Sequence, residues 1–429
     1  MPTTQNPTNQ PPVDLVYPAS ARKADVEPLP AADISLAVGR PGRELCLYPA
    51  SVGYELQSEL DFLSNRSAEP NVFFSARFLV PAMPRLEDKV IRLAVMRDND
   101  ERRSRLRFLM PYSIEKPGFS IGPSIMRAWA NHFGPLGTPL VDAEDAAENL
   151  DNVLEAFSSP LAGLPSVLVL PEMRLNSPIA SLLKTIAIGR NLPVQATEKS
   201  LRPMLQSYED GQTYLQGSVS ASHLREMRRQ WRKLEEMGDL TYTVSRQRQD
   251  IRLRMEEFLA LEAGGWKGRK RTAMANDRYG AAFFREAITN LAEIDAVRIH
   301  TLDLDGKAIA SMIVFIMAGE AYTWKTAYDE SLARFSPGKL LVARLTEWHL
   351  DDANIERTDS CAVPDHPIMS RMWLEREEMG TLLIGLRPNA DRDLRQVANQ
   401  LHMYASTRNV AKMIRNKLLS MARRGRNPE

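Results

Sequence analysis

Hydrophobic residues in the first half of the chain recur at two spacings, one typical of strands and one of helices. Residues 91–95 and 106–110 alternate apolar and polar positions around a polar turn at 98–101, which predicts two strands. In residues 54–63, Leu56, Leu60 and Leu63 are four and three positions apart, which predicts a helix. The expected order is a strand, two helices, three strands, a helix, a strand, a helix and a strand. The strands are expected at 45–48, 91–95, 106–110, 125–129, 167–170 and 193–196, and the helices around 54–63, 74–79, 143–157 and 179–188.

The second half begins with an amphipathic segment, residues 222–237, whose apolar side chains lie three and four positions apart while arginines cover the other face. Asp305-Gly306 is a two-residue hairpin turn between two strands. Strands are expected at 240–244, 297–304, 308–317, 321–328, 355–362 and 381–386, and helices at 222–237, 251–263, 279–291, 336–349 and 367–377. The two halves share an order of elements without an obvious repeat of residues, which indicates a duplicated fold.

Residues 320–342, EAYTWKTAYDESLARFSPGKLLV, predict a strand, a turn and a loop whose Ser336 and Pro337 begin a helix. Serine is a good N-cap, and proline at the first helical position loses no hydrogen bond. Gly338 lets a ligand approach the backbone, and Lys339 adds positive charge to the helix N-terminus, as do Arg334 and Arg344 around it. The loop therefore predicts a pyrophosphate site. The alternative is that Ser-Pro-Gly simply begins a helix.

Bulk composition narrows the classes of protein. The 429 residues carry 55 Lys plus Arg and 54 Asp plus Glu, so the net charge of +1 gives no general case for nucleic acid or membrane binding. The two cysteines and the absence of a Cys/His cluster with ligand spacing favour a reducing compartment and no metal site. Without a secretory signal or a long apolar run, the protein is expected to be soluble and cytoplasmic.

The two ends differ from the middle of the chain. Residues 1–35 are rich in proline and polar residues, which predicts a disordered tail. Residues 387–429 predict a basic helical tail, which offers weak contact with RNA or an anionic membrane surface. A solvated helix is the alternative for this second tail, and the chain is also open to homo-oligomer formation.

The middle of the chain resembles a known family of proteins. The order of elements in residues 239–386, with the phosphate loop between the fourth strand and third helix, resembles the GNAT superfamily of acyl-CoA-dependent N-acyltransferases. The runs LEAGGWKGRKRTAM, YTWKTAYDE, ARFSPGKLL and DSCAVPDHP more closely resemble a bacterial GNAT branch of cellulose-biosynthesis acetyltransferases, which is similar to the double-unit FemAB aminoacyl transferases. The resemblance covers residues 43–386, and the segment 334–339 supplies only part of the usual GNAT phosphate motif.

The resemblance implies an α/β (α+β) fold of two tandem GNAT-like domains, each a mixed, mainly antiparallel sheet flanked by helices. The first domain is expected at 36–213 in degenerate form and the second, which binds acyl-CoA, at 214–386. The first-half loop at 132–142 leads into Asp142, Glu144 and Asp145, which repel phosphate. The co-substrate implied is acetyl-CoA or another acyl-CoA, held by Arg334, Phe335, Ser336, Gly338, Lys339 and Leu340.

In GNAT folds the fourth and fifth strands diverge and the acyl donor lies between them. By that analogy the gap lies between residues 321–329 and 355–362. Lys325 is unusual in an apolar strand, because a buried ammonium needs a partner, and Asp329 or Asp359 is expected to provide it. The pair either orients the acceptor or forms a structural salt bridge that fixes the two strands.

Amine acylation benefits from a general base and from donors to the oxyanion and leaving group. Asp329, Asp359 and His366 are the candidate bases, with Asp329 preferred because it ends the strand at the expected thioester. Tyr328 is the candidate donor to the leaving thiolate. The alternatives are a turn carboxylate at 329, a capping histidine at 366 and a core aromatic at 328. A ping-pong route through Cys361 is the less favoured chemistry.

The acceptor is expected at the loop 264–271, because the loop between the first two GNAT helices often meets the acceptor. Trp266 offers a stacking surface, and Lys267 and Arg269 a positive field, which suits a carbohydrate-like or anionic acceptor; Trp324 on the neighbouring strand completes the substrate-binding set. A solvated charge run with one anchoring tryptophan is the alternative.

The leading function is acyl-CoA-dependent N-acyl transfer, expected to be acetylation, from a small-molecule donor to an amine or carbohydrate acceptor such as an amino sugar or polysaccharide precursor. Two alternatives remain. One is FemAB-like transfer from aminoacyl-tRNA, supported by the duplicated fold and the basic helix and tail. The other is a non-catalytic scaffold in polysaccharide synthesis.

Overall fold

The computed structural model describes residues 32–86, 89–100 and 103–424, and of 408–424 only the backbone helix. Residues 1–31 of the predicted N-terminal tail, and the side chains from residue 408 onwards in the predicted basic C-terminal tail, therefore lie outside the described residues. Ile34 already belongs to a strand, so ordered structure begins slightly earlier than the composition of the tail indicates.

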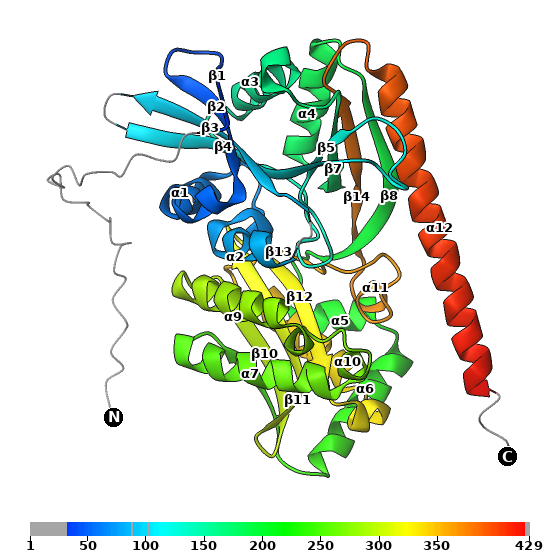
Figure 1. Ribbon diagram of the computed structural model, residues 1–429. Coiled ribbons are helices and arrows are strands. Elements are labelled where there is room, and N and C mark those ends of the chain that lie inside the picture. Colours follow the sequence, from blue (N-terminus) through cyan, green and yellow to red (C-terminus); the bar gives the residue numbers. More distant parts are fainter. Residues whose placement is uncertain (1–31, 87–88, 101–102, 425–429) are drawn as a thin grey trace, which may run out of the picture. The chain divides into compact units, whose positions relative to one another are not determined.

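The described residues form a sheet of 14 strands with helices on both faces (Figure 1). The strands run in the order β1-β2-β3-β4-β5-β7-β14-β8-β13-β12-β11-β10-β9, and β6 pairs with β4. Only two of the neighbouring pairs are parallel, β5 with β7 and β12 with β13. The predicted mixed, mainly antiparallel sheet is confirmed. The strand bounds are β1 Ile34–Ala37, β2 Arg43–Pro49, β3 Arg92–Asp100, β4 Arg103–Glu115, β5 Ile125–Ala128, β6 Leu140–Val141, β7 Val167–Arg174, β8 Val194–Leu205, β9 Leu240–Ser245, β10 Val297–Leu304, β11 Lys307–Met317, β12 Glu320–Tyr328, β13 Arg357–Asp359 and β14 Glu375–Gly385.

The helices follow the predicted order closely. The amphipathic segment 222–237 is α6, and the helix expected at Ser336 is α10. A short helix, α5, lies in a polar stretch for which no helix was expected. The bounds are α1 Gln57–Arg66, α2 Ala76–Leu86, α3 Ala146–Ser158, α4 Pro178–Gly189, α5 Gly211–Ser218, α6 Ala221–Glu235, α7 Arg248–Gly264, α8 Trp266–Arg269, α9 Arg278–Glu293, α10 Pro337–Asp351, α11 Met369–Met372 and α12 Asp391–Arg424.

The last strand, β14, lies inside the first half of the sheet. It pairs antiparallel with β7 on one side and with β8 on the other. The final residues of β8, Met204 and Leu205, also pair with β13 of the second half. The helix predicted over 367–377 is wrong beyond Met372, because the charged run from Glu375 pairs with β8 as a strand. The two halves therefore share one continuous sheet.

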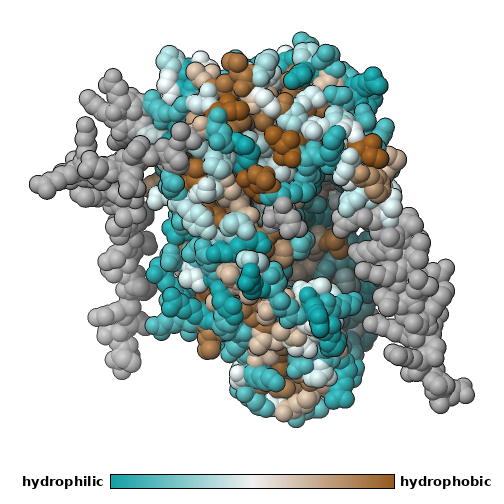
Figure 2. Space-filling view, in the orientation of Figure 1, coloured by the Kyte–Doolittle hydropathy of each residue, from teal (hydrophilic) through white to brown (hydrophobic). Residues whose placement is uncertain are grey.

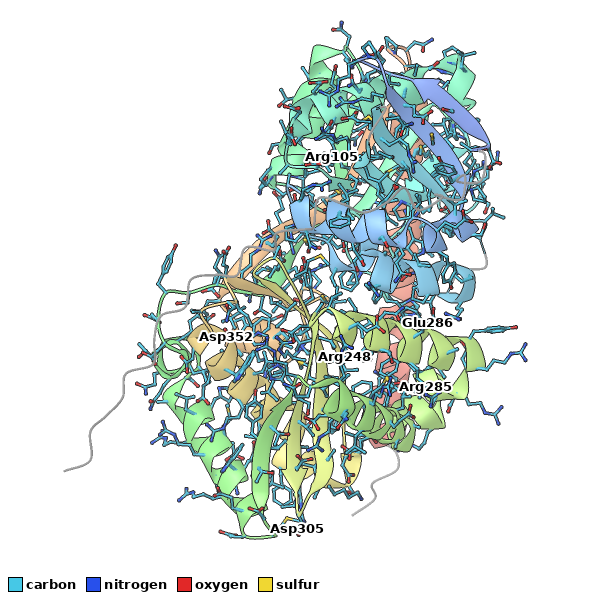
Figure 3. All side chains as sticks on the ribbon, turned by 90° about the vertical axis from the view of Figure 1, so that its left-hand side faces the viewer. Arg105, Arg248, Arg285, Glu286, Asp305 and Asp352 are labelled. Atoms are coloured by element: carbon cyan, nitrogen blue, oxygen red, sulfur yellow. The ribbon has the colours of Figure 1, made fainter. Side chains whose placement is uncertain are left out.

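Side chains from both halves also meet between α2 and α9. Phe78 of α2 contacts Phe283 of α9 edge to face, with ring centroids 5.2 Å apart. Glu286 of α9, labelled in Figure 3, forms an ion pair with Arg85 of α2 at 2.7 Å. An aromatic core with a salt bridge at its edge thus joins the halves beside the sheet.

Helix α12 packs its first turns against the sheet through Leu394, Val397, Ala398 and Leu401. On the face shown in Figure 2, apolar residues form small patches separated by polar ones. Among the helices of the described residues, none has both the length and the apolar character needed to cross a membrane.

Candidate functional site

Strands β12 and β13 are paired for only three residues. Glu320, Ala321 and Tyr322 pair with Arg357, Thr358 and Asp359, after which β12 continues to Tyr328 without β13 beside it. The register of β12 against β11 also shifts at Ile313/Val314, so Trp324 is the extra residue of a bulge. The strands therefore part where the resemblance implies a gap.

The phosphate loop follows β12. Ser336 is the N-cap residue of α10, as predicted, and has a left-handed backbone with φ of 52°. Its hydroxyl does not cap the helix but accepts a long hydrogen bond from Nε2 of Gln230, at 3.5 Å. Among the other residues predicted to bind the donor, Phe335 and Leu340 are buried in the core, and Arg334 is exposed with its guanidinium 4.6 Å from the ring centroid of Phe335.

A cavity of about 90 Å³ lies beside the first turn of α10. Lys339 lines it together with Ser220 and His223 from the start of α6 and with Arg371 of α11. Neither Lys339 nor Arg371 has an ion-pair partner in the part of the chain that the structure describes. Two helix N-termini and two free cations make this phosphate-loop pocket favourable for an anion. Sequence reasoning found Lys339 but missed the other three, because they come from elements distant in the chain.

Tyr328 connects the phosphate loop to the opposite side of β12. A Cβ atom on Gly338 would lie 3.5 Å from Cδ1 of Tyr328, so the ring packs against the loop backbone. The side chain is 37% exposed and lines two cavities, of about 30 and 420 Å³, next to α7. The predicted donor to the leaving thiolate is thus open to solvent and adjoins both cavities.

The larger of these cavities is mainly acidic. Glu257, Asp329 and Glu330 line it, with Lys307 as the one cation among its lining residues. Oδ1 of Asp329 accepts hydrogen bonds from the amide and hydroxyl of Ser331 at 2.9 and 2.7 Å, which begin the short 3₁₀ turn after β12. Asp329 is therefore both a turn residue and a carboxylate at the cavity wall.

The predicted acceptor loop contains helix α8, and carboxylates neutralise two of its positive charges. Lys267 donates to the buried carboxylate of Glu262 at 2.7 Å, and Arg269 pairs with Glu330. The amide of Trp266 also donates to Glu330, and the half-exposed indole lies 5.0 Å from Nζ of Lys270. The positive field expected here is thus offset, and Glu262, which organises the loop, was missed because nothing in its local sequence marks it as buried.

Lys325 does not pair with Asp329 or Asp359, the two partners expected from the sequence. Its ammonium faces aromatic rings, 4.7 Å from the centroid of Phe133 and 5.2 Å from that of Trp324. Loss of water and, to a smaller degree, the nearby charge of Lys267 lower the pKa of Lys325 from 10.5 to about 8. Cation–π contacts offset only part of the cost of burying this ammonium.

Trp324 is a core residue. It is stacked on Phe284 with ring centroids 5.7 Å apart, and its Nε1 donates to the carbonyl of Phe133 at 2.6 Å. Because of the bulge, the indole of Trp324 points towards the aromatic core between the two halves. The indole therefore has no open face on which an acceptor could stack.

Asp359 is enclosed by structural partners. Arg174 and Arg202 reach Oδ2 of Asp359 at 3.0 and 3.2 Å, and the amide of Cys361 donates to Oδ1 at 2.7 Å. Burial opposes ionisation, but the two guanidiniums dominate and hold the pKa of Asp359 below its ordinary value. Arg174 also pairs with Glu320, so this buried cluster joins β7 to β12 and β13.

His366 and Cys361 have structural surroundings as well. Nδ1 of His366 accepts from the amides of Ile368 and Met369 at 3.4 and 3.2 Å, and burial lowers the pKa of its imidazole. Burial raises the pKa of the Cys361 thiol well above its ordinary value. A capping histidine and a neutral thiol give little support to a His366 base or to a ping-pong route. Among the described residues, no group of three or more His, Cys, Asp or Glu has the arrangement of a metal site.

Comparisons with known proteins agree with this geometry. The family model of the acetyltransferase (GNAT) domain matches residues 221–362. No curated protein sequence matches the chain. Among solved structures, the C-terminal domain of a putative lysylphosphatidylglycerol synthetase from Agrobacterium fabrum has a TM-score of 0.51 at 14% identity, covering 82% of this chain and 96% of that one. FemX has a TM-score of 0.49 at 8% identity, covering 76% and 95%. The second half of the chain therefore contains a GNAT acetyltransferase domain at residues 221–362, which makes the protein an acyltransferase.

Proposed function

We propose that the protein is an acyl-CoA-dependent N-acyltransferase, with acetyl as the transferred group, that acts on a small amine such as an amino sugar. The observation that carries this proposal is the parting of β12 from β13 directly before a helix whose first turn lines a cationic pocket. An acyl-CoA bound in the GNAT manner would lay its extended thioester along the parted strands and its phosphates at this pocket.

The donor side fits the chemistry of a pyrophosphate. Lys339 and Arg371 supply charge, and Ser220 and His223 supply polar atoms at the first turn of α6. Phe335 and Leu340 support the loop from within the core. An acyl-CoA bound here supplies a thioester carbonyl, and the residues of the phosphate-loop pocket hold its anionic part.

The acceptor side fits a cationic amine better than an anionic ligand. Three carboxylates line the cavity; Glu257 and Glu330 are paired with Arg254 and Arg269, and Asp329 forms no ion pair among the described residues. Such walls attract an ammonium and stabilise it before deprotonation. The proposal therefore favours a cationic amine over the anionic acceptor that was one of the two expectations from the sequence.

The residues at the end of β12 suit a proton transfer across the strand. Asp329 takes a proton from the acceptor ammonium, and the neutral amine attacks the thioester carbonyl. A carbon–nitrogen bond forms, the attacking nitrogen releases its second proton to solvent, the carbon–sulfur bond breaks, and the thiolate leaves with a proton from the Tyr328 hydroxyl. That hydroxyl recovers a proton from solvent, to which its side chain is open.

Isothermal titration of the full-length protein with acetyl-CoA and with CoA tests the donor site. We expect Lys339→Glu to weaken both ligands by roughly tenfold to a hundredfold, because a charge-assisted contact becomes a repulsion. Charge reversal at Arg252, an exposed residue of α7, is the matched control and should leave binding unchanged. Failure of the unmodified protein to bind either ligand refutes the proposed function.

A further inference from the structure

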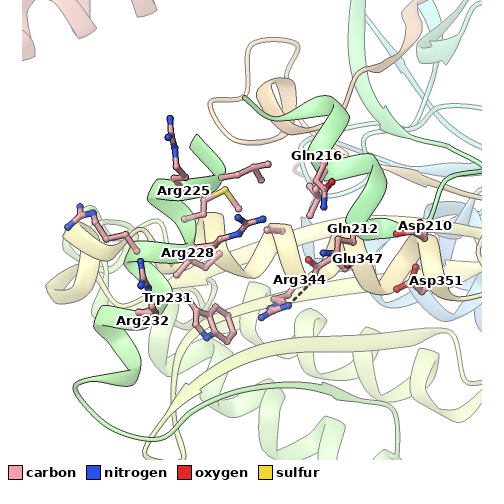
Figure 4. Close-up of a pocket in the computed structure, with 16 residues that line it drawn as sticks. Asp210, Gln212, Gln216, Arg225, Arg228, Trp231, Arg232, Arg344, Glu347 and Asp351 are labelled. Carbon is pink, nitrogen blue, oxygen red and sulfur yellow. Dashed lines mark hydrogen bonds and ion pairs between the residues drawn. The ribbon is translucent and has the colours of Figure 1, made fainter. Parts of the chain in front are cut away.

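A groove of about 1150 Å³ lies between α5, α6 and α10 and shares Leu340 with the residues assigned above to the donor (Figure 4). Its volume exceeds the usual range for a small-molecule pocket, roughly 300–1,000 Å³. The size of the groove therefore favours part of a macromolecule as its occupant.

One wall of the groove is a row of arginines on α6. Arg225, Arg228 and Arg232 lie at spacings of three and four residues, are exposed, and have no ion-pair partner in the described part of the chain. With a rise of 1.5 Å per residue, the row is about 10 Å long. By contrast, Arg229 pairs with Glu226, and Arg344 pairs with Glu347. The three unpaired guanidiniums would be complemented by a partner that presents several negative charges at the spacing of a helix face.

The floor of the groove is apolar. Leu215 of α5, Leu224 and Met227 of α6, and Leu340 of α10 line it, with the indole of Trp231 beneath the guanidinium of Arg344 at 4.4 Å. A phosphate backbone satisfies the arginines but leaves these apolar side chains without partners. An amphipathic helix with acidic residues on one side satisfies both surfaces, in the manner of helix-in-groove recognition.

The groove adjoins the phosphate-loop pocket. His223 lines the pocket and the next residue, Leu224, lines the groove; Lys339 and Leu340 are divided in the same way. A partner that occupies the groove therefore lies directly beside the seat proposed for the donor's phosphate.

We propose that this arginine groove docks an acidic helix of an acyl carrier protein, whose phosphopantetheine arm presents the thioester to the gap between β12 and β13. The inference rests on the proposed function, since it names a macromolecular source of the same thioester. The arm carries a phosphate, as CoA does, and enters beside Lys339. Transfer forms the amide bond to the acceptor, breaks the thioester, and releases the carrier as a protonated thiol.

Fluorescence anisotropy of a labelled acyl carrier protein, titrated with the full-length protein, measures docking without turnover. In the triple variant Arg225→Glu, Arg228→Glu and Arg232→Glu, we expect the Kd to rise roughly tenfold to a hundredfold, because three attractive charges become repulsive. Glutamate is a good helix former, so α6 should persist, which circular dichroism checks. Arg252→Glu should bind the carrier as the unmodified protein does.

Turnover with acetyl-loaded carrier, acetyl-CoA and acetyl-pantetheine then distinguishes the carrier from other possible occupants of the groove. The triple variant should lose activity with acetyl-loaded carrier but keep it with acetyl-CoA and acetyl-pantetheine. The inference is overturned if the unmodified protein does not bind the carrier, or if the triple variant binds it equally well. It is also overturned if the variant loses acetyl-CoA but not acetyl-pantetheine, which places the CoA nucleotide in the groove, or if an RNA acceptor stem binds there and the carrier does not. If all three donors are inactive with every amine tested, the proposed function fails, while the anisotropy result still decides the docking.

Discussion

Replacing Lys325 by methionine should stabilise the protein, and the size of the effect follows from its surroundings. The pKa of this lysine is lowered from 10.5 to about 8, chiefly by loss of water. A shift of about 2.5 units at about 1.36 kcal/mol per unit corresponds to roughly 3 kcal/mol. Methionine keeps the long apolar stem between Phe133 and Trp324 and removes the charge, so the free energy of unfolding at pH 7 should rise by up to about 3 kcal/mol.

The sign of the pH dependence gives a second check. The unfolded protein keeps the Lys325 proton up to pH 10.5, whereas the folded protein loses it near pH 8. Between these values the unfolded state binds more protons, so stability rises with pH, and the cost of burying the charge is present in full only below pH 8. The advantage of Lys325→Met should therefore be largest at pH 7 and shrink towards pH 10.

Urea unfolding of both proteins at pH 7 and pH 10 measures this difference. Lys307→Met, at an exposed lysine of β11, is the matched control and should show no such change with pH. Equal stability of the Lys325→Met and unmodified proteins at pH 7, or a difference that does not depend on pH, would refute the reasoning. A variant that gains stability but loses turnover would assign Lys325 to the reaction, since evolution would then retain a costly charge for function.

Two further substitutions separate structure from chemistry. Asp359→Asn should lower the free energy of unfolding, measured in urea, by about 3 kcal/mol, because Arg174 and Arg202 lose a buried counter-charge. The control Asp151→Asn, in an exposed ion pair, should lower it by less than about 1 kcal/mol. Similar losses in the two variants would contradict the argument from burial. Asp329→Asn should reduce kcat by roughly a hundredfold to ten-thousandfold with little change in Tm, because its amide oxygen still accepts from the backbone; parallel losses of activity and Tm would remove Asp329 from the base role.

The sequence predicted elements well where a periodic pattern and a local stop signal coincide. Ser336 and Pro337 located the start of α10, and Asp305-Gly306 located the hairpin, where both residues have positive φ. The order of elements and the partly matched loop 334–339 were enough to predict the superfamily. These features depend on neighbours in the chain.

The site residues were harder to predict because their roles depend on partners far away in sequence. The carboxylate of Asp359 is neutralised by arginines of β7 and β8, and Lys325 faces Phe133 of the first half rather than a carboxylate. The bulge at Trp324 also breaks the regular alternation of side chains along β12, which the sequence pattern does not reveal. Arg371 became part of the phosphate-loop pocket only through tertiary packing.

The position of β14 has a consequence for synthesis of the chain. Its neighbours β7 and β8 leave the ribosome early, but the strand that belongs between them begins at Glu375, 170 residues after β8 ends at Leu205. At roughly 5–20 residues per second, the nascent first half waits on the order of ten seconds or more with two unpaired strand edges. Folding of the first half is thus completed only when the second half has been made, and the two halves mature as one cooperative unit.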